Sequence, residues 1–446
     1  MGAVKGDKTL IMALHIRHII VGFFEMLICK VAMDHHRSHN PNSSYRHHRQ
    51  HHHRQHHHRQ QHHPYQCRTT PGQNHVSSRG LSTRREEYER AFPVYKQPVE
   101  VGCFSLDSKR RFFNDSRQLR YYVEPDRSPN FDLRDGYRDR YIKRDENVKE
   151  KLDHILRWIV ANRSKLSSRV TTGSPCALDV NFVTWRGHLT KLLTTPYEAR
   201  EGWLLAVSRF MGTLYISEVE TEAARQEREN RADRQKEMMY WGYKFEQYTC
   251  ADNVQSLPDP GGVVNTNEAF CTVVQTRLED HRLLFSGEVD CRDKDPSAPP
   301  PPACYVELKT SAEICTPKQR SNFHRFKLLK WWAQSFLPGV PRVVAGFRDH
   351  EGVVVSVENF SISKISHLIK SEHNCWKPTV CMNFCCDFLS FVKRTATEDN
   401  PNVVYLFSYE PHRDVTYSIH RDSQYSFLPH WYVEEMTSDQ DRHQQS

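Results

Sequence analysis

The sequence FSGEVD at residues 285–290 is strand-like, and a second strand-like segment, YVELK, follows at residues 305–309. Side chains two positions apart on a strand point to the same face. The two acids of the first segment would therefore share a face, as would the glutamate and the lysine of the second. If the two segments pair as a hairpin, three carboxylates and one ammonium group meet in a small patch. These side chains are Glu288, Asp290, Glu307 and Lys309.

Three carboxylates this close together resist being ionised at the same time unless positive charge lies among them. Mg²⁺ meets this need, because it prefers a few carboxylate oxygens completed by waters and substrate phosphates. The patch is therefore typical of a metal-dependent hydrolase of phosphoesters or pyrophosphates. The alternative is two solvated strand faces, since such short triplets also occur by chance. Apolar neighbours such as Phe285, Val289 and Leu308 favour the site, because acids within apolar runs are costly unless paired or coordinated.

Composition separates the first 66 of the 446 residues from the rest of the chain. They hold 15 of the 27 histidines, and without them the formal charge of +8 falls close to zero. Whole-chain charge therefore does not argue for a nucleic-acid partner. We expect a disordered His/Arg/Gln-rich extension at 1–66, a single catalytic domain at 67–440 and a disordered tail at 441–446.

The apolar stretch within residues 9–33 is interrupted by charged residues and is shorter than the ~20 residues that span a bilayer. No clean cleavage site follows it. The 13 cysteines form no CxxC pair, which favours reduced thiols. We therefore expect an intracellular protein that is not secreted and has no stable membrane association.

Helix and strand patterns alternate along the rest of the chain, which indicates an α/β or α+β fold. Periodicity predicts helices at 147–166, 218–248, 319–336 and 365–395, and strands at 178–185, 203–210, 213–219, 342–347, 353–357 and 403–409. Residues 292–303 include a run of four prolines, so we expect a surface loop without a strand there.

Three further residues are candidates for the same site. Glu246 lies at the apolar end of the long predicted helix, and Gly242 would let that helix approach the sheet closely. Arg186 ends a predicted strand, and its forked donors suit a phosphate. Gln334 follows two tryptophans late in a helix, where it would position a water or merely pack. Each of these polar residues, taken alone, is more often a surface group.

In their order along the chain, these segments resemble the decapping exoribonuclease family (DXO), the eukaryotic enzymes that act on RNA 5′ ends. The matching elements are Arg186, GYKFE at 242–246, EVD at 288–290, ELK at 307–309 and Gln334. The resemblance covers about residues 95–435. It implies a mixed α/β fold with two mixed β-sheets flanked by helices and an active-site cleft between them. The core would be similar to that of D-(D/E)xK-type nucleases.

The resemblance also implies roles for the site residues. The metal would be Mg²⁺, with Mn²⁺ as a substitute, and its ligands would be Glu246, Glu288, Asp290, Glu307 and the backbone carbonyl of Leu308. The same four acids, together with Lys309 and Gln334, would carry catalysis. Substrate would be held by Arg186, Glu246, Lys309 and Gln334.

The implied activity is hydrolysis at RNA 5′ ends in mRNA quality control. It comprises removal of triphosphates, of unmethylated guanosine caps and of NAD-type caps, and then 5′→3′ degradation of the exposed monophosphate RNA. NAD would be a substrate only, and no redox cofactor is expected because no GxGxxG loop is present. The family implies nuclear residence, with cytoplasmic residence as an addition.

Two other functions stay open at this point. The same acids would serve a metal-dependent DNA nuclease, because they do not distinguish sugars. The second alternative is a catalytically weak scaffold that stabilises a partner 5′→3′ exonuclease. The sequence identifies no particular protein partner and does not rank the 5′ ends.

Overall fold

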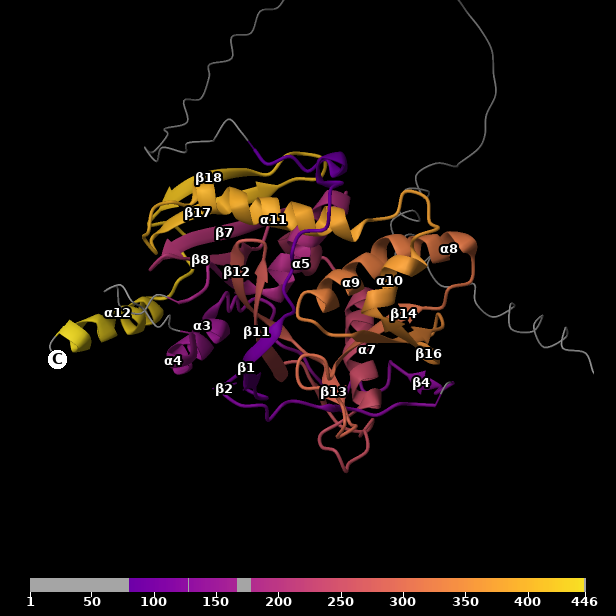
Figure 1. Cartoon of the computed structure of the whole chain (residues 1–446). Helices are drawn as coiled ribbons and strands as arrows, with labels where there is room; N and C mark the ends of the chain where they lie inside the picture. Colours follow the sequence, from indigo (N-terminus) through magenta and orange to yellow (C-terminus); the bar gives the residue numbers. More distant parts are fainter. Residues whose placement is uncertain (1–79, 127, 167–177, 445–446) are drawn as a thin grey trace, which may run out of the picture.

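The computed structural model describes residues 80–126, 128–166 and 178–444. Two large mixed sheets dominate this part of the chain, as the family resemblance implied (Figure 1). In sheet order, the strands of the first are β18 (Thr416–Arg421), β17 (Val403–Tyr409), β7 (Trp203–Phe210), β8 (Thr213–Val219), β6 (Phe182–Trp185), β12 (His281–Glu288), β11 (Ala269–Leu278), β1 (Val99–Leu106) and β2 (Phe112–Phe113). Here β6 runs parallel to both of its neighbours, and the other pairs are antiparallel.

The second sheet is smaller and is also mixed. Its strands, in order, are β4 (Phe131–Asp132), β16 (Val353–Ser361), β15 (Arg342–Arg348), β14 (Tyr305–Ala312), β13 (Cys291–Asp293), β3 (Tyr121–Tyr122) and β9 (Cys250–Ala251). The central pair β14–β15 is parallel. A separate two-stranded sheet, which the sequence did not predict, joins β5 (Tyr141–Ile142) to β10 (Val264–Asn265).

Helices fill the space between the two sheets and cover their outer faces. The inner set comprises α5 (Arg186–Thr194), α8 (Pro317–Asn322), the π-helical turn η3 (Phe323–Lys327), α9 (Leu328–Phe336), α10 (Ile362–Leu368) and α11 (Pro378–Thr395), with short turns η1 (Arg85–Tyr88) and η2 (Thr195–Tyr197). The outer set comprises α3 (Asp153–Ala161), α4 (Arg163–Leu166) and α12 (His430–Gln444) against the first sheet, and α7 (Asp233–Thr249) against the second, with α6 (Glu222–Glu229) preceding α7.

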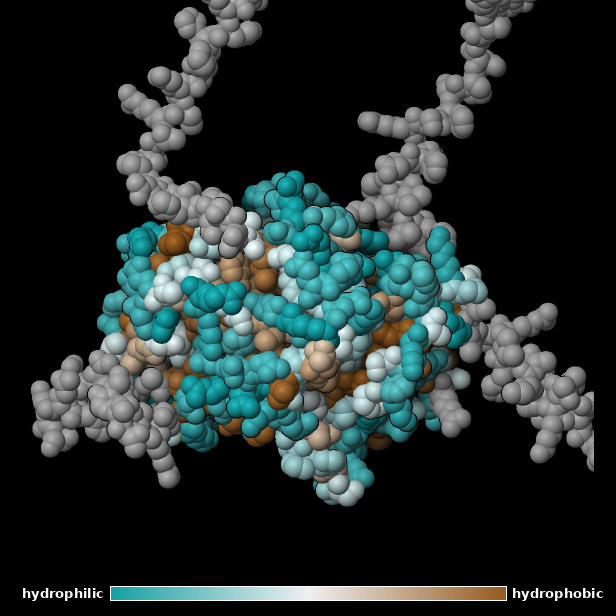
Figure 2. All heavy atoms as spheres, turned by 45° about the horizontal axis from the view of Figure 1, so that its top comes forward, coloured by the Kyte–Doolittle hydropathy of each residue, from teal (hydrophilic) through white to brown (hydrophobic). Residues whose placement is uncertain are grey.

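The largest apolar cluster lies between the sheets. It joins Phe285 of β12 and Val343 of β15 through Leu192 of α5, Trp332 of α9 and Phe388 of α11. Figure 1 shows α5 and α9 next to each other where the two halves of the molecule meet. One face of the molecule is largely covered by hydrophilic side chains (Figure 2). The apolar area buried between the layers therefore fixes the two sheets relative to each other.

The expected hairpin between 285–290 and 305–309 is wrong. Strand β12 ends at Glu288 in the first sheet, and the chain then crosses to the second sheet, where β13 pairs with β14. The crossing is held by Val289, which is buried in a small cluster with Tyr305. Alternation of side chains along a segment does not show that it leaves one sheet for another, so the sequence pattern missed the crossing.

Several other boundaries differ from the predictions. The predicted helix 218–248 is instead the end of β8 followed by two helices separated at 230–232. Thr221 caps the start of the first helix, and Gln235 accepts from the Ala232 amide at the start of the second. The predicted helix 365–395 is interrupted at 369–377, where Pro378 starts α11. Helix α3 begins only at Asp153, after Lys151 with a φ of 46°. Strand β6 is shorter than predicted, and β13 takes the first two residues of the expected loop 292–303.

Most of the remaining predicted strands and helices are present, some of them with different boundaries. Strands 203–210, 213–219 and 403–409 are confirmed, and those at 342–347 and 353–357 are confirmed but longer. The predicted helix 319–336 is present but starts at Pro317 and contains the π turn. Helix α12 extends to Gln444, into the segment 441–446 for which we expect disorder. The extension 1–66 lies outside the described residues. Within the described residues, no helix is long and apolar enough to cross a bilayer, and the cysteines are free thiols.

Candidate active site

Glu307 is the point at which three elements meet. Its side chain is only 2% exposed, and it lies on the face of β14 that also carries Lys309. One carboxylate oxygen, Oε1, accepts hydrogen bonds from Lys309 Nζ and from Gln334 Nε2 of α9, the latter at 2.5 Å. The other, Oε2, accepts from Arg186 at the start of α5 at 3.4 Å. The structure therefore brings three of the sequence-predicted site residues together around the carboxylate of a fourth.

Asp290 lies beside this group, in the crossing between the sheets. Its Oδ2 accepts a hydrogen bond from the backbone amide of Leu308 at 2.6 Å. Strand β13 pairs with β14 only at Tyr305 and Val306, so the edge of β14 is open at Leu308. The amide and carbonyl of one residue point to the same side of a strand. The Leu308 carbonyl therefore points to the side on which Asp290 lies.

Glu246 and Glu288 complete the set from the other side. Glu246 comes from α7, is 15% exposed and accepts a hydrogen bond from Arg120 at 2.7 Å. Glu288, at the end of β12, is exposed, and the two glutamates line the same small cavity. A helix-end glutamate facing water, the alternative for Glu246, is not what the structure shows.

The charges of these groups interact strongly. Burial raises the pKa of Asp290 to about 7, and the nearby Glu307 adds to the effect. Burial and then Asp290 raise the pKa of Glu246 well above its usual value. Burial alone would raise the pKa of Glu307, but Lys309 and Arg186 hold it below the usual value. The site thus carries more negative charge than its own cations neutralise, which is the situation a bound divalent cation relieves.

The donor set suits a hard cation, although the side chains are not arranged around one. Carboxylate and carbonyl oxygens are the ligands that Mg²⁺ and Mn²⁺ prefer. Among the residues that the structure describes, however, no three His, Cys, Asp or Glu side chains form a group ready to hold a metal. Glu246 is turned to Arg120, and Glu307 to Lys309 and Gln334. Metal binding would therefore exchange some of these hydrogen bonds for ligand bonds.

The start of α5 adds a second feature that suits an anion. Trp185 precedes the helix and makes no side-chain cap, so the first amide groups are not capped by a side chain. Such an N-terminus attracts phosphate groups. It opens onto a cavity of about 760 Å³ that contains Arg186, Gly187 and Glu288. The cavity is also lined by many basic residues, but several are paired with acids, such as Arg110 with Glu150 at 2.9 Å.

The role expected for Gly242 is wrong. A Cβ atom built there meets no atom within 4 Å, so the glycine is not needed for a close approach. The close contact lies at Gly346 of β15, where an added Cβ would be 2.6 Å from the ring of Phe245. Phe245 directly precedes Glu246, so this packing places the glutamate.

Two residues of the site escaped the sequence analysis. Arg120 pairs with Glu246 from the loop before β3, where no motif marks it. Tyr243 is partly exposed and lines two cavities at the site, and only its place in the GYKFE segment pointed to it. Lys244 of that segment is fully buried and bonds to Asp135 at 2.9 Å and to the Pro260 carbonyl at 2.6 Å. Its role is therefore structural.

Comparison with known proteins places the chain in one class of nucleases. Residues 96–433 match the family described as RAI1-like PD-(D/E)XK nuclease. The chain therefore belongs to the RAI1-like PD-(D/E)XK nucleases, which confirms the resemblance and the fold class expected from the sequence.

Individual relatives carry more specific names. The chain is 58% identical to the bovine decapping and exoribonuclease protein and 57% identical to the human one, each over 80% of this chain and 90% of the relative. It is 35% identical to the decapping nuclease RAI1 of Neurospora crassa over 69% of this chain and 74% of the relative.

Solved structures give the same fold. Rai1 of Scheffersomyces stipitis superposes with a TM-score of 0.69 at 25% identity, covering 83% of this chain and all of that one. Rai1 of Candida albicans, solved in complex with pU5 and Mn²⁺, gives a TM-score of 0.68 at 24% identity and covers 82% of this chain and 99% of that one.

Proposed function

We propose that this protein hydrolyses the 5′ ends of RNA. It removes 5′-triphosphates, unmethylated guanosine caps and NAD-type caps, and it degrades the exposed RNA in the 5′→3′ direction. The observation that carries this proposal is the convergence of Lys309, Gln334 and Arg186 on the buried Glu307. The extensive identity to named decapping and exoribonuclease proteins supports it.

We further propose that the site works with Mg²⁺, for which Mn²⁺ substitutes. Glu246, Glu288, Asp290, Glu307 and the Leu308 carbonyl would hold it, directly or through waters. When bound, such a metal supplies Lewis-acid stabilisation of the phosphoryl oxygens and a more acidic attacking water. The raised pKa values of Glu246 and Asp290 support a cation at this place. The Mn²⁺ in the Candida albicans Rai1 complex supports a divalent cation in that relative.

The protein's own residues then have separate tasks. Lys309 keeps its proton, because burial alone would lower its pKa but Glu307 and Asp290 raise it. Its ammonium group stabilises the negative charge that develops at phosphorus. Gln334 orients the attacking water or a substrate oxygen through its carboxamide. Arg186 and the first amide groups of α5 hold a phosphate of the strand.

The competing functions predict different behaviour. A DNA nuclease would cut DNA as readily as RNA. A scaffold would have no need of a buried acid that accepts three charged or amide donors, because such a group costs stability unless every partner is present.

We propose nuclear residence, with cytoplasmic residence as an addition, on the family resemblance alone.

The proposal is tested with purified protein and a panel of short oligonucleotides. The RNAs carry 5′-triphosphate, 5′-monophosphate, NAD or unmethylated-guanosine ends, and a DNA of matched sequence serves as the comparison. We expect end removal and shortening of the RNAs in Mg²⁺ but not in chelator, with the DNA left intact. Equal cutting of the DNA would favour the nuclease alternative, and no turnover of any RNA by folded protein would favour the scaffold.

A further inference from the structure

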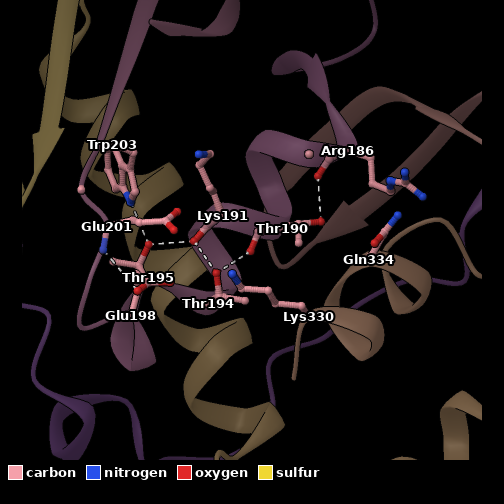
Figure 3. Close-up of a pocket in the computed structure, with 12 residues that line it drawn as sticks. Arg186, Thr190, Lys191, Thr194, Thr195, Glu198, Glu201, Trp203, Lys330 and Gln334 are labelled. Atoms are coloured by element: carbon pink, nitrogen blue, oxygen red, sulfur yellow. Dashed lines mark hydrogen bonds between the residues drawn. The ribbon is translucent and has the colours of Figure 1, made fainter. Parts of the chain in front are cut away.

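A third cavity, of about 370 Å³, reaches the same catalytic centre. It shares Arg186 and Gly187 with the larger cavity and also contains Gln334, so Glu307 has a partner residue in each. Figure 3 shows its walls: α5 and the turn η2 that follows it contribute three threonines, and Lys330 of α9 extends toward α5 beside Thr194. A cavity of this size accepts about one nucleotide.

Lys330 differs from the other cations of this cavity. It lies four residues before Gln334, and this spacing places both on one face of α9. Lys191 bonds to Glu218 at 2.8 Å, and Arg186 contacts Glu307. Lys330 is exposed, and within the described residues no hydrogen bond or ion pair engages its ammonium group. Its charge is thus available to a ligand.

The other walls restrict what that ligand can be. Thr190 and Thr195 donate their hydroxyl protons to helix carbonyls at 3.1 and 2.8 Å, so they offer the cavity only acceptor oxygens. Arg186 and Gln334 lie at the catalytic end of the cavity, where both donate to Glu307. Among the described lining residues, Lys330 therefore supplies the donor for an anion farther along the cavity, beside Thr194 (Figure 3). Glu198 and Glu201 line the cavity as well and would repel a second phosphate. The cavity suits one phosphate and no longer anionic chain.

We infer that Lys330 forms a one-phosphate subsite for the substrate RNA, next to the phosphate that is hydrolysed. This inference rests on the proposed function, since it assigns the subsite to the same substrate. The phosphate belongs either to the 5′ group that is removed or to the next nucleotide of the strand. Both present the same anion to Lys330. Lys330 binds this phosphate directly and takes no part in the chemical step.

The test measures RNA binding in chelator, where no cleavage intervenes, by fluorescence anisotropy over a range of salt concentrations. We expect Lys330→Met to weaken binding about tenfold. The slope of log affinity against log salt should become shallower by about 0.7, the loss of one contact to single-stranded RNA. Lys330→Arg should restore both. Lys364→Met, at an exposed lysine of the neighbouring α10, should match the wild type.

RNAs with 5′-hydroxyl and 5′-triphosphate ends distinguish the two sources of the phosphate. A defect with both ends assigns the subsite to the strand, and a defect confined to the triphosphate assigns it to the 5′ group. Unchanged affinity and salt slope in Lys330→Met with every RNA would overturn the inference. Failure of the wild-type protein to bind any RNA would overturn the proposed function and this inference with it.

Discussion

A single buried oxygen, Glu307 Oε1, accepts hydrogen bonds from both Lys309 and Gln334. Two donors on one oxygen hold the carboxylate in one orientation, and Arg186 takes the other oxygen. A buried network of charges adds little to the stability of the fold. Its fixed geometry is therefore better explained by a need to hold these groups in place for the substrate. At the scale of residues, this arrangement is the strongest sign of catalysis.

Replacing Lys309 with methionine tests this arrangement. The variant keeps the length of the side chain but loses the ammonium group to which we assign stabilisation of the reacting phosphoryl group. We expect kcat to fall about 100-fold or more, as when one charge-stabilising donor is lost from an active site. Steady-state kinetics on 5′-triphosphate RNA measures the change, with circular dichroism as the control for folding. A kcat within threefold of the wild type would show that Lys309 is not part of the chemistry.

His188, on α5, predicts how stability depends on pH. Its Nε2 accepts from the Glu218 amide at 3.3 Å, and Thr184 uses its own hydroxyl proton on the Ile216 carbonyl, so Nδ1 carries the proton of a neutral ring. Burial lowers the pKa of His188 from 6.5 to about 4, although the nearby Glu218 opposes the effect. Because the folded pKa is depressed, this contribution to stability is complete above pH 6.5 and is lost as the pH falls toward 4.

The expected size of the loss is about 3 kcal/mol between pH 7 and pH 4. Urea unfolding of the wild type and of His188→Gln at both pH values measures it. The gap in unfolding free energy between the two proteins should shrink by that amount at pH 4. A constant gap would mean that His188 does not titrate with a depressed pKa in the folded protein.

The candidates Glu288, Asp290, Glu307 and Lys309 could be named from two short strand-like segments, whereas Glu246, Arg186 and Gln334 could be named only through the family resemblance. Arg120 could not, since it is an ordinary arginine that becomes part of the site only when its loop is folded against α7. The packing role predicted for Gly242 was wrong for a related reason. Its place in a helix next to the site suggested a packing role, but packing depends on the partner surface, which the sequence does not display.

At the scale of elements, the contact of α7 with β15 sets the position of Glu246. Gly346→Ala would place a Cβ 2.6 Å from Phe245 of that helix. We expect it to lower the unfolding free energy by about 1–3 kcal/mol, the usual effect of overpacking, and to lower kcat by shifting Glu246.

Gly242→Ala is the matched control on the same helix. The new methyl group meets nothing, so removal of a helix-interior glycine should stabilise the protein by about 0.5–1 kcal/mol. Urea unfolding of both variants checks the pair. Equal effects of the two substitutions would contradict the packing that the structure shows.

Periodicity predicted the element type correctly where the whole segment stays within one sheet, as in β7, β8 and β17. Predicted boundaries were wrong where caps or prolines interrupted a helix-forming stretch, as in the charge-rich segment between α6 and α7 and before Pro378 at the start of α11. The crossing after Glu288 was not predicted for a different reason. Which sheet a strand joins is decided by contacts with residues far away in the chain, and Val289 supports the crossing by packing with Phe270 and Tyr305.

At the scale of the whole molecule, the site lies where the chain passes from one sheet to the other. Asp290 interacts with Glu307 and Lys309 on β14 and with Glu288 on β12. Neither sheet alone carries the complete set, and the helices between the sheets hold Arg186 and Gln334. The two-sheet core and the active site are therefore one structural unit.

Because the two-sheet core and the active site form one structural unit, we predict that the N-terminal extension, residues 1–66, is dispensable for catalysis. A chain that begins at residue 67 should keep the kcat and the thermal unfolding midpoint of the full chain, because the family match begins at residue 96. Kinetics and calorimetry of the two chains make the comparison. A loss of activity on truncation would show that the extension contributes to the site.

The most direct test of metal-dependent hydrolysis at this site is the rate of triphosphate removal from 5′-triphosphate RNA. It is measured in Mg²⁺ for the wild type and for Glu288→Ala/Asp290→Ala, with chelator as the control. We predict turnover by the wild type, none in chelator, and a loss of at least 1000-fold in the variant, whose fold is verified by circular dichroism. Activity of the folded variant near that of the wild type, or undiminished activity in chelator, would contradict the account.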